Sequence, residues 1–168
     1  LYYFGNSYEE PNPSYSENVW ESGLGQKAWM HKRIGMAYSK SISGPWKRVY
    51  QPILNPRLGE WDNSITSNPS PVVLPDGSVY LIYKSSPVNY NPPLLLGAAQ
   101  ADSFLGPYLR LSDKPIFSFH SDQNHENDVE DPFVWHNGQH FELIMKDRYG
   151  KNCGEEGGGI HAYSKDGI

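Results

Sequence analysis

The sequence repeats itself about every 62 residues, and this period constrains the fold more than any other feature of the chain. The segment "IGMAYSKSISGPWKR" that begins at Ile34 returns as "LGAAQADSFLGPYLR" from Leu96, and "GIHAYSKDGI" from Gly159 starts the pattern a third time. A second pattern shares the period, because "PVVLPDGSVYLIYKSS" from Pro71 matches "PFVWHNGQHFELIMKD" from Pro132 at a spacing of 61. Two independent patterns with one period indicate a chain built from one repeated structural unit. Three alanines fall in register at spacings of 62 and 63: Ala37, Ala99 and Ala162.

The repeated unit is made of short antiparallel strands. In the second copy an apolar segment at Val72–Leu74 enters the tight turn "PDG", and Ser78–Lys84 then alternates as a second strand, so the two form a hairpin. A third strand at Leu95–Ala101 and a turn at "GP" lead to a fourth strand, "YLRL". The third copy begins in the same way, with its turn at "HNG". The first copy starts inside its second strand, "LYYFG", and residues 8–32 replace the shorter loops of the other copies.

A strand-rich period of this length predicts β-propeller blades of four antiparallel strands around an axis, since no single unit can bury its apolar faces alone. Propellers typically close with at least about four blades, whereas the 168 residues hold two complete copies and a remnant. We therefore expect a fragment, one partial propeller domain over residues 1–168. It would hold the end of a first blade (1–54), a second blade (55–117) and an incomplete third blade (118–168). No signal peptide can be inferred from an N terminus of this kind.

Composition excludes several classes of partner. Lysine and arginine total 14 against 19 aspartates and glutamates, a net charge of −5, and no basic stripe forms, so no nucleic acid is expected as a partner. No stretch approaches the roughly 18 apolar residues that span a bilayer, and no membrane association is expected. Cys153 is the single cysteine, which excludes a disulfide within this sequence. The sequence does not indicate an oligomeric state.

Antiparallel order predicts which loops lie together. The inner strand of a blade starts at the end where the second strand finishes, so connectors between blades share one side with the loops from second to third strands. This side collects residues 8–32, the connector "LGEWDNSITSN" with Trp61 and Asp62, and the connector "FHSDQNHENDVE" with His125. The other side receives tight turns. Long polar and aromatic loops on one side indicate a binding face.

Three segments resemble a known family. "DVEDPFVWHNGQHFELIMKD", in which Glu130 and Pro132 open an inner strand, is similar to the "EGP" segment of five-bladed β-propeller glycosidases, the glycoside hydrolase family 43-like enzymes and their relatives. "SNPSPVVLPDGSVYLIYK" resembles their "DPS" segment and hairpin, and "RIGMAYSKSISGPWKR" resembles their outer strands. The resemblance covers almost the whole chain. It implies a fragment of a five-bladed propeller that hydrolyses a glycosidic bond with three essential carboxylates, one from each of the first three blades, and requires no cofactor.

The chemistry of glycosidic cleavage is an independent reason to consider Glu130. A glycosidic oxygen is a poor leaving group, so a carboxylic acid must protonate it, and burial or a neighbouring negative charge must raise the pKa of that acid. The resemblance assigns this role of general acid to Glu130. Asp131 beside it could separate the pKa values of the two carboxylates, but neighbours on an extended strand point to opposite sides. The alternative is a solvated Glu130 next to a strand-start turn.

The sequence departs from the family pattern at two positions. Asp131 replaces the glycine of "EGP", and Asn68 replaces the aspartate of "DPS". Asparagine can hydrogen-bond a sugar hydroxyl but supplies no negative charge, so another group would have to raise the pKa of the acid. Asp62, Asp131 and Asp147 are the candidates. The general base of the family belongs to the inner strand of the first blade, which we expect before the first residue of this sequence.

Further residues on the binding face have more than one interpretation. Lys146, Asp147 and Arg148 end a strand there, where a cation could bind a carboxylate-bearing or sulfated sugar, or simply be surface charge. Trp61 could stack on a sugar ring or pack between sheets. The connector around His125 could hold a structural Ca²⁺, hydrogen-bond a sugar or be a solvated loop, and its spacing matches neither a calcium loop nor a zinc site.

Two functions from different classes remain. The first is a glycoside hydrolase that cleaves a poly- or oligosaccharide, with Glu130 protonating the leaving group, and polysaccharide degradation of this kind would imply a secreted or periplasmic protein. The second is a non-catalytic carbohydrate-binding propeller, in which Asn68, Trp61, His125 and Glu130 only hold a ligand. The asparagine of "NPS" favours the second function. A fold by itself does not separate the two.

Overall fold

The computed structural model describes residues 1–6, 29–87, 93–117 and 128–168, and over these ranges the protein is all-β. The strands form three antiparallel sheets that follow one another along the chain, with the orders β1-β2-β3, β4-β5-β6-β7 and β8-β9-β10. The all-β class with antiparallel sheets is therefore confirmed. The strands are β1 (Tyr2–Gly5), β2 (Arg33–Tyr38), β3 (Lys47–Leu54), β4 (Ser67–Val73), β5 (Val79–Ser85), β6 (Leu95–Ala101), β7 (Leu109–Arg110), β8 (Val129–His136), β9 (Phe141–Asp147) and β10 (Gly159–Ser164).

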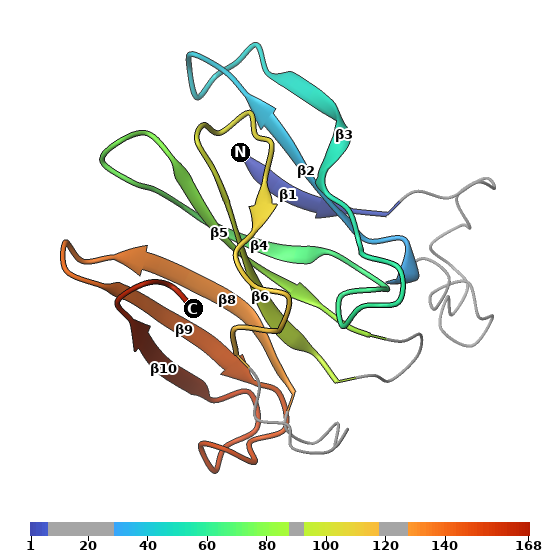
Figure 1. The fold of residues 1–168 in the computed structure, drawn as a ribbon, viewed down its shortest axis with the longest axis vertical. Helices are drawn as coiled ribbons and strands as arrows, with labels where there is room; N and C mark the ends of the chain where they lie inside the picture. Colours follow the sequence, from blue (N-terminus) through green and yellow to red (C-terminus); the bar gives the residue numbers. More distant parts are fainter. Residues whose placement is uncertain (7–28, 88–92, 118–127) are drawn as a thin grey trace.

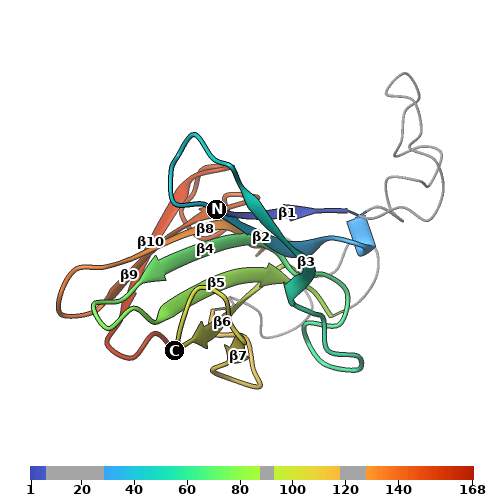
Figure 2. The same ribbon diagram turned by 90° about the horizontal axis from the view of Figure 1, so that it is seen from above.

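The three sheets lie side by side like sectors of a wheel (Figure 1). β4 lies between β1 and β8 and contacts both, so each sheet contributes one strand to a common centre. The end strands lie away from that centre, as is seen for β10 in Figure 1 and for β7 in Figure 2. In the described part of the chain, no helix has the length and apolar character needed to cross a membrane.

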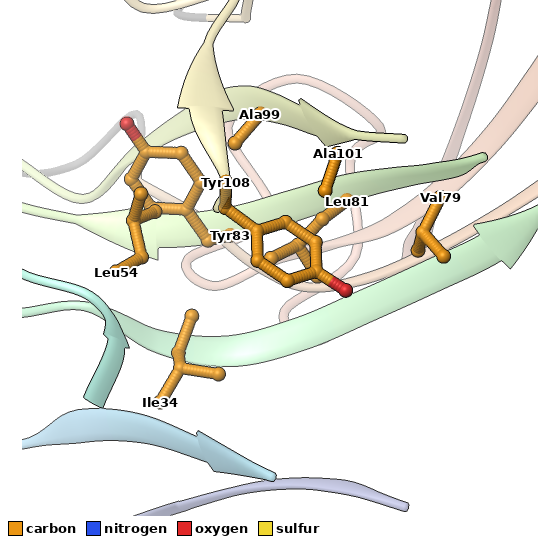
Figure 3. Close-up of a cluster of buried hydrophobic side chains, with 8 residues drawn as sticks. All are labelled: Ile34, Leu54, Val79, Leu81, Tyr83, Ala99, Ala101 and Tyr108. Atoms are coloured by element: carbon orange, nitrogen blue, oxygen red, sulfur yellow. The ribbon is translucent and has the colours of Figure 1, made fainter. Parts of the chain in front are cut away.

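Two apolar cores hold the sheets together, one on each face of the second sheet. β5 supplies both, because its successive side chains alternate between the faces. Burying one such aliphatic or aromatic side chain stabilises the fold by about 1.5–3 kcal/mol. The first core, between the first and second sheets, contains Ile34, Leu54, Val79, Leu81, Tyr83, Ala99, Ala101 and Tyr108 (Figure 3). The second core, between the second and third sheets, contains Tyr80, Ile82, Leu96, Ala98, Val129, Val134, Leu143 and Met145.

The hairpins predicted from "PDG" and "HNG" are confirmed. They join β4 to β5 and β8 to β9, and the glycine of each turn has a positive φ, 88° at Gly77 and 97° at Gly138. Side chains are rarely tolerated in this left-handed conformation, which explains the glycine at both positions. Most predicted strand boundaries are within about one residue of the structure, but one differs by five residues. β4 begins at Ser67 rather than at Val72, because pairing with β5 resumes beyond an irregularity in the ladder.

The same irregularity occurs in β4 and in β8, at the start of both strands. Ser67 pairs with Lys84 and Glu130 pairs with Lys146, and in each ladder the register shifts immediately afterwards, as in a β-bulge. The residue that follows is left-handed in both strands, with φ of 48° at Asn68 and 53° at Asp131. Asparagine and aspartate are the non-glycine residues that most readily adopt this conformation. The chain is therefore not extended at Asp131, and simple alternation does not predict where that side chain points.

Candidate functional site

The starts of β4 and β8 and the ends of β5 and β9 meet at one edge of the structure. The pairs Ser67 with Lys84 and Glu130 with Lys146 define this edge. Their pairing confirms the prediction that the inner strands begin where the second strands finish. Charged side chains from three strands converge here around Glu130, and we call this set, Lys32, Lys84, Glu130, Asp131 and Lys146, the Glu130 cluster.

Glu130 binds two ammonium groups. The Nζ of Lys84 donates to its Oε2 at 2.9 Å, and the Nζ of Lys146 lies 3.4 Å from its Oε1. The Lys84 side chain is only 6% exposed, whereas the Lys146 side chain is 41% exposed. The carboxylate of Glu130 thus joins a buried lysine of the second sheet to an accessible lysine of the third.

These lysines determine the protonation of Glu130. Burial alone would raise the pKa of the carboxyl group, but the positive charges and hydrogen bonds of Lys84 and Lys146 outweigh burial and hold the pKa below its ordinary value. The pKa of Glu130 is thus lowered, whereas the sequence analysis expected the raised pKa of a proton donor. Without a ligand, Glu130 is a carboxylate at neutral pH.

Asn68 and Asp131 meet between the two bulges. The side-chain amide of Asn68 donates a short hydrogen bond to Oδ1 of Asp131, which links β4 to β8 across the gap between their sheets. The Oδ1 of Asn68 and the Oγ of Ser67 are buried and have no hydrogen-bond partner among the described residues. An open pocket of about 420 Å³ adjoins this pair, lined by Tyr2, Tyr3, Phe4, Asn68, Pro69, Asp131 and Pro132.

Lys32 belongs to the same cluster, although the sequence did not single it out. Its backbone carbonyl accepts a hydrogen bond from the amide of Thr66 at 3.2 Å, which fixes the start of β2 beside the start of β4. Its Nζ lies over two rings, 5.6 Å from the centre of Phe4 and 5.9 Å from that of Trp29. Burial and the charge of Lys84 lower the pKa of Lys32, and the charges of Glu130 and Asp131 oppose this.

A signal for Lys32 does exist in the repeat. The third strand of each unit starts where the second strand ends, so the residue before β2 must lie at the edge that carries Lys84 and Lys146. Lys84 and Lys146 occupy equivalent places in their sheets, since each pairs with the residue before a bulge, and both bind Glu130. The position of Lys32 could have been predicted by the same topological argument.

Trp61 and Asp62 lie away from the Glu130 cluster, in the packing between the first and second sheets. Trp61 stacks on Tyr83 at a centroid distance of 6.0 Å and an interplanar angle of 22°. Asp62 is completely buried, accepts a hydrogen bond from the Tyr83 hydroxyl at 3.0 Å, and forms ion pairs with Arg57 and Arg110. The partners of Trp61 and Asp62 therefore lie in the packing between these sheets. Trp61 was a candidate to stack on a sugar, and Asp62 was a candidate to raise the pKa of Glu130.

Asp147 and Arg148 shape the loop after β9. Asp147 is fully buried and accepts backbone hydrogen bonds from Gly150, Asn152 and Cys153. Burial opposes ionisation of Asp147, but the bonds from Cys153 and Asn152 outweigh it and lower the pKa. The Arg148 guanidinium lies 3.5 Å from Asp128 and 5.0 Å from the centre of the Tyr149 ring. Asp147 holds the loop, while Lys146 faces Glu130.

His125 and the rest of residues 118–127 lie outside the described residues, as do residues 7–28. The described ranges contain no group of three or more His, Cys, Asp or Glu side chains that could hold a metal ion. Cys153 is exposed. A structural Ca²⁺ in the connector around His125 therefore stays a prediction.

Solved structures with a similar fold are glycoside hydrolases. Zg3597, a family 117 glycoside hydrolase produced by the marine bacterium Zobellia galactanivorans, matches 99% of this chain with a TM-score of 0.62 and 21% sequence identity. A putative glycoside hydrolase from Bacteroides ovatus matches 79% of it with a TM-score of 0.53 and 20% identity. Another glycoside hydrolase matches 68% with a TM-score of 0.53 and 20% identity.

These similarities show the fold, the antiparallel β-propeller arrangement of glycoside hydrolases. The chain spans 40% of the length of Zg3597 and 38% to 39% of the other two proteins. No protein-family model matches the chain, and no curated protein matches its sequence.

Proposed function

We propose that this protein is a glycoside hydrolase that cleaves a poly- or oligosaccharide at the edge formed by β4, β5, β8 and β9. The observation that carries the proposal is the Glu130 cluster: a largely buried carboxylate beside a second carboxylate, Asp131, at the bulged starts of inner strands. The fold shared with glycoside hydrolases supports it. Kinship with the family 43-like enzymes, a five-bladed propeller and a secreted or periplasmic location are parts of this proposal.

Glu130 acts as the general acid in this proposal. Because Lys84 and Lys146 lower its pKa, Glu130 must gain its proton after the substrate has weakened at least one of these ion pairs. Lys146 is the partner that can move, since its side chain is 41% exposed and its contact is the longer one. A sugar hydroxyl or anion that draws Lys146 away would raise the pKa of Glu130 toward the range of a proton donor.

Asn68 and Asp131 hold the sugar in this proposal. The pocket beside them is open and combines aromatic walls, Tyr2, Tyr3 and Phe4, with the polar groups of both residues. Such a lining suits a sugar, which has apolar ring faces and hydroxyls at its edge. Ser67 and Asn68 each have a buried polar atom without a hydrogen-bond partner among the described residues. Buried polar groups normally have such partners, so these two atoms are open to a ligand.

Replacing Glu130 by glutamine tests the catalytic role. Glutamine keeps the shape and can still accept a hydrogen bond from Lys84, but it cannot donate the proton of a carboxylic acid. We expect the Glu130→Gln variant of the full-length protein to release reducing sugar from a panel of oligosaccharides about 10²–10⁴ times more slowly than wild type. Binding of the same sugars, measured by calorimetry, should change far less. Glu60→Gln, at an exposed loop position, is the matched control.

A carbohydrate-binding propeller without activity is the second candidate, and one observation favours it. The pKa of Glu130 is lowered rather than raised, and an ionised carboxylate held by lysines is suited to accept hydrogen bonds from sugar hydroxyls. In that case wild type and Glu130→Gln would both bind oligosaccharides and neither would release reducing sugar. Equal turnover by the two proteins would instead exclude Glu130 as the acid.

A further inference from the structure

We infer that the site at the Glu130 cluster selects an acidic sugar, one that carries a carboxylate or a sulfate group, and that Lys32 binds this anion. The inference rests on the proposed function, because it names the class of substrate that the same site would accept.

The charge of the cluster carries the first step. Three lysines and two carboxylates meet at this edge, so the described cluster has an excess of one positive charge. Glu130 is shared by Lys84 and Lys146 at 2.9 and 3.4 Å, and Asp131 accepts its hydrogen bond from Asn68. Among the described residues, the ammonium group of Lys32 lies over aromatic rings rather than in an ion pair. Lys32 is thus the cation with capacity for an added anion.

The second step concerns the electrostatic free energy of Lys32 and Lys84 in the unliganded cluster. Lys32 is half-buried and Lys84 is buried, and the two positive charges are close enough for Lys84 to lower the pKa of Lys32. Burial and the charge of Lys84 outweigh the opposing charges of Glu130 and Asp131, so the positive charge of Lys32 is not fully compensated in the unliganded site. An anion placed beside Lys32 would offset both the burial and the repulsion, so the cluster favours a negatively charged ligand over a neutral one.

The surroundings of Lys32 carry the third step, from anion to acidic sugar. Phe4 is 43% exposed as a residue, and it lines the pocket that also contains Asn68 and Asp131. Aromatic faces stack on sugar rings, while the amide and carboxylate groups bind hydroxyls. A free inorganic anion would use only the lysine. A sugar that bears an anionic group would use the lysine, the aromatic ring and the polar pair together.

An acidic substrate would also change the pKa of Glu130. An anionic group near Lys32 and Lys146 reduces the positive potential at the carboxylate of Glu130 and draws Lys146 toward the ligand. Both effects raise the pKa of Glu130, the direction that a proton donor needs. A neutral sugar would attract Lys146 only through its hydroxyls, so it would raise the pKa of Glu130 less than an acidic sugar would.

Matched pairs of ligands test the inference on the full-length protein. Uronic-acid oligosaccharides are compared with their carboxyl-reduced counterparts, and sulfated oligosaccharides with their desulfated counterparts, by isothermal titration calorimetry at low and at moderate salt. We expect one of the two acidic classes to bind at least about tenfold more tightly than its neutral counterpart, with weaker binding at higher salt. The class that binds distinguishes a carboxylate from a sulfate.

Variants of Lys32 then locate the preference. Lys32→Met keeps an unbranched apolar chain over Phe4 and Trp29 and should remove most of the acidic preference, so that the acidic and neutral counterparts bind with similar affinity. Lys32→Arg retains the charge and should retain the preference. Lys47→Met, which removes an exposed lysine of β3, is the control and should behave as wild type.

The outcomes separate this inference from the proposed function. Equal affinity of wild type for acidic and neutral counterparts, no binding of either acidic class, or an acidic preference that survives Lys32→Met would overturn the inference. Hydrolysis of neutral sugars in any of these cases would leave the hydrolase proposal intact. A preference that depends on Lys32 without release of reducing sugar would support the anion site and contradict the hydrolase proposal.

Discussion

Two carboxylates of this protein each bind two cations, and their surroundings differ in an instructive way. Asp62 is completely buried between the first and second sheets, where it meets Arg57, Arg110 and the hydroxyl of Tyr83. Glu130 meets two lysines at the edge of the second and third sheets, and its side chain is 17% exposed. One carboxylate is enclosed by packing, and the other retains an accessible side.

The choice of cation matches the difference in burial. Arginine has a planar guanidinium with fixed donor directions, so it holds a buried carboxylate in one geometry, whereas lysine is a compact charge on a flexible chain. The ion pairs of Asp62 therefore organise the packing between sheets. The ion pairs of Glu130, above all the one with Lys146, can be exchanged for a ligand. A carboxylate with two cationic partners is a structural element in one place and a candidate site in the other.

The largest expected effect on stability comes from replacing Asp62, the buried one of the two carboxylates. Asp62→Asn removes the carboxylate that Arg110 binds and leaves Arg57 with only the exposed Asp113 among the described residues, so it should lower the free energy of unfolding by about 3–5 kcal/mol, as breaking a buried ion pair does. Urea denaturation followed by tryptophan fluorescence measures it. Asp113→Asn is the control, because this second partner of Arg57 is 97% exposed and its loss should change the free energy by less than about 0.5 kcal/mol. A small effect of Asp62→Asn would abolish the distinction between the two carboxylates.

Glu130→Gln should have a smaller and pH-dependent effect on stability. The folded state holds the pKa of Glu130 below its ordinary value of 4.5, so the stabilisation by its ion pairs is complete above that value and disappears as the pH falls through the folded pKa. The variant should be less stable than wild type by about 1–2 kcal/mol near neutral pH, and the difference should shrink as the pH falls below 4.5. Urea denaturation across this pH range measures it, and a constant difference would contradict the assignment.

The two lysines that bind Glu130 should lower its pKa to different extents, and this is the smallest of the expected effects. Lys84→Met removes the buried partner at 2.9 Å and should raise the pKa of Glu130 more than Lys146→Met, which removes the partly exposed partner at 3.4 Å. The second variant should cost less than about 0.5 kcal/mol in stability. Carboxyl carbon chemical shifts of Glu130 in an NMR pH titration measure both pKa values. The reverse order would show that Lys146 is the stronger partner.

The strands could be predicted because their signals are local. The alternation over Val79–Ser85, the turn glycines Gly77 and Gly138 and the shared period all reflect neighbours in the chain, and the sheets follow them. The start of β4 was missed because a bulge depends on pairing with β5, which the sequence does not display. The direction of Asp131 was missed for the same reason, since its left-handed φ belongs to the equivalent bulge in β8.

The candidate site was only partly predictable, because charge pairing is not local. Glu130 and its position beside Lys146 follow from the hairpin, but Lys84 reaches Glu130 across 46 residues of sequence. Asp62 was a candidate for raising the pKa of Glu130 because the sequence did not show its partner Arg110, which lies 48 residues away. A sequence shows that a carboxylate is present. The cations that surround it, and therefore the direction of its pKa shift, depend on tertiary structure.

The alternation of β5 has a consequence for how such a protein can change over time. Tyr83 donates to Asp62 on one face, and the next residue, Lys84, donates to Glu130 on the other. Inserting or deleting one residue in this strand would exchange the two faces, so that a lysine entered the core and a tyrosine met Glu130. β5 can therefore accept substitutions but not changes of length. The number of residues in β5 should accordingly stay fixed in related sequences, even where its side chains differ.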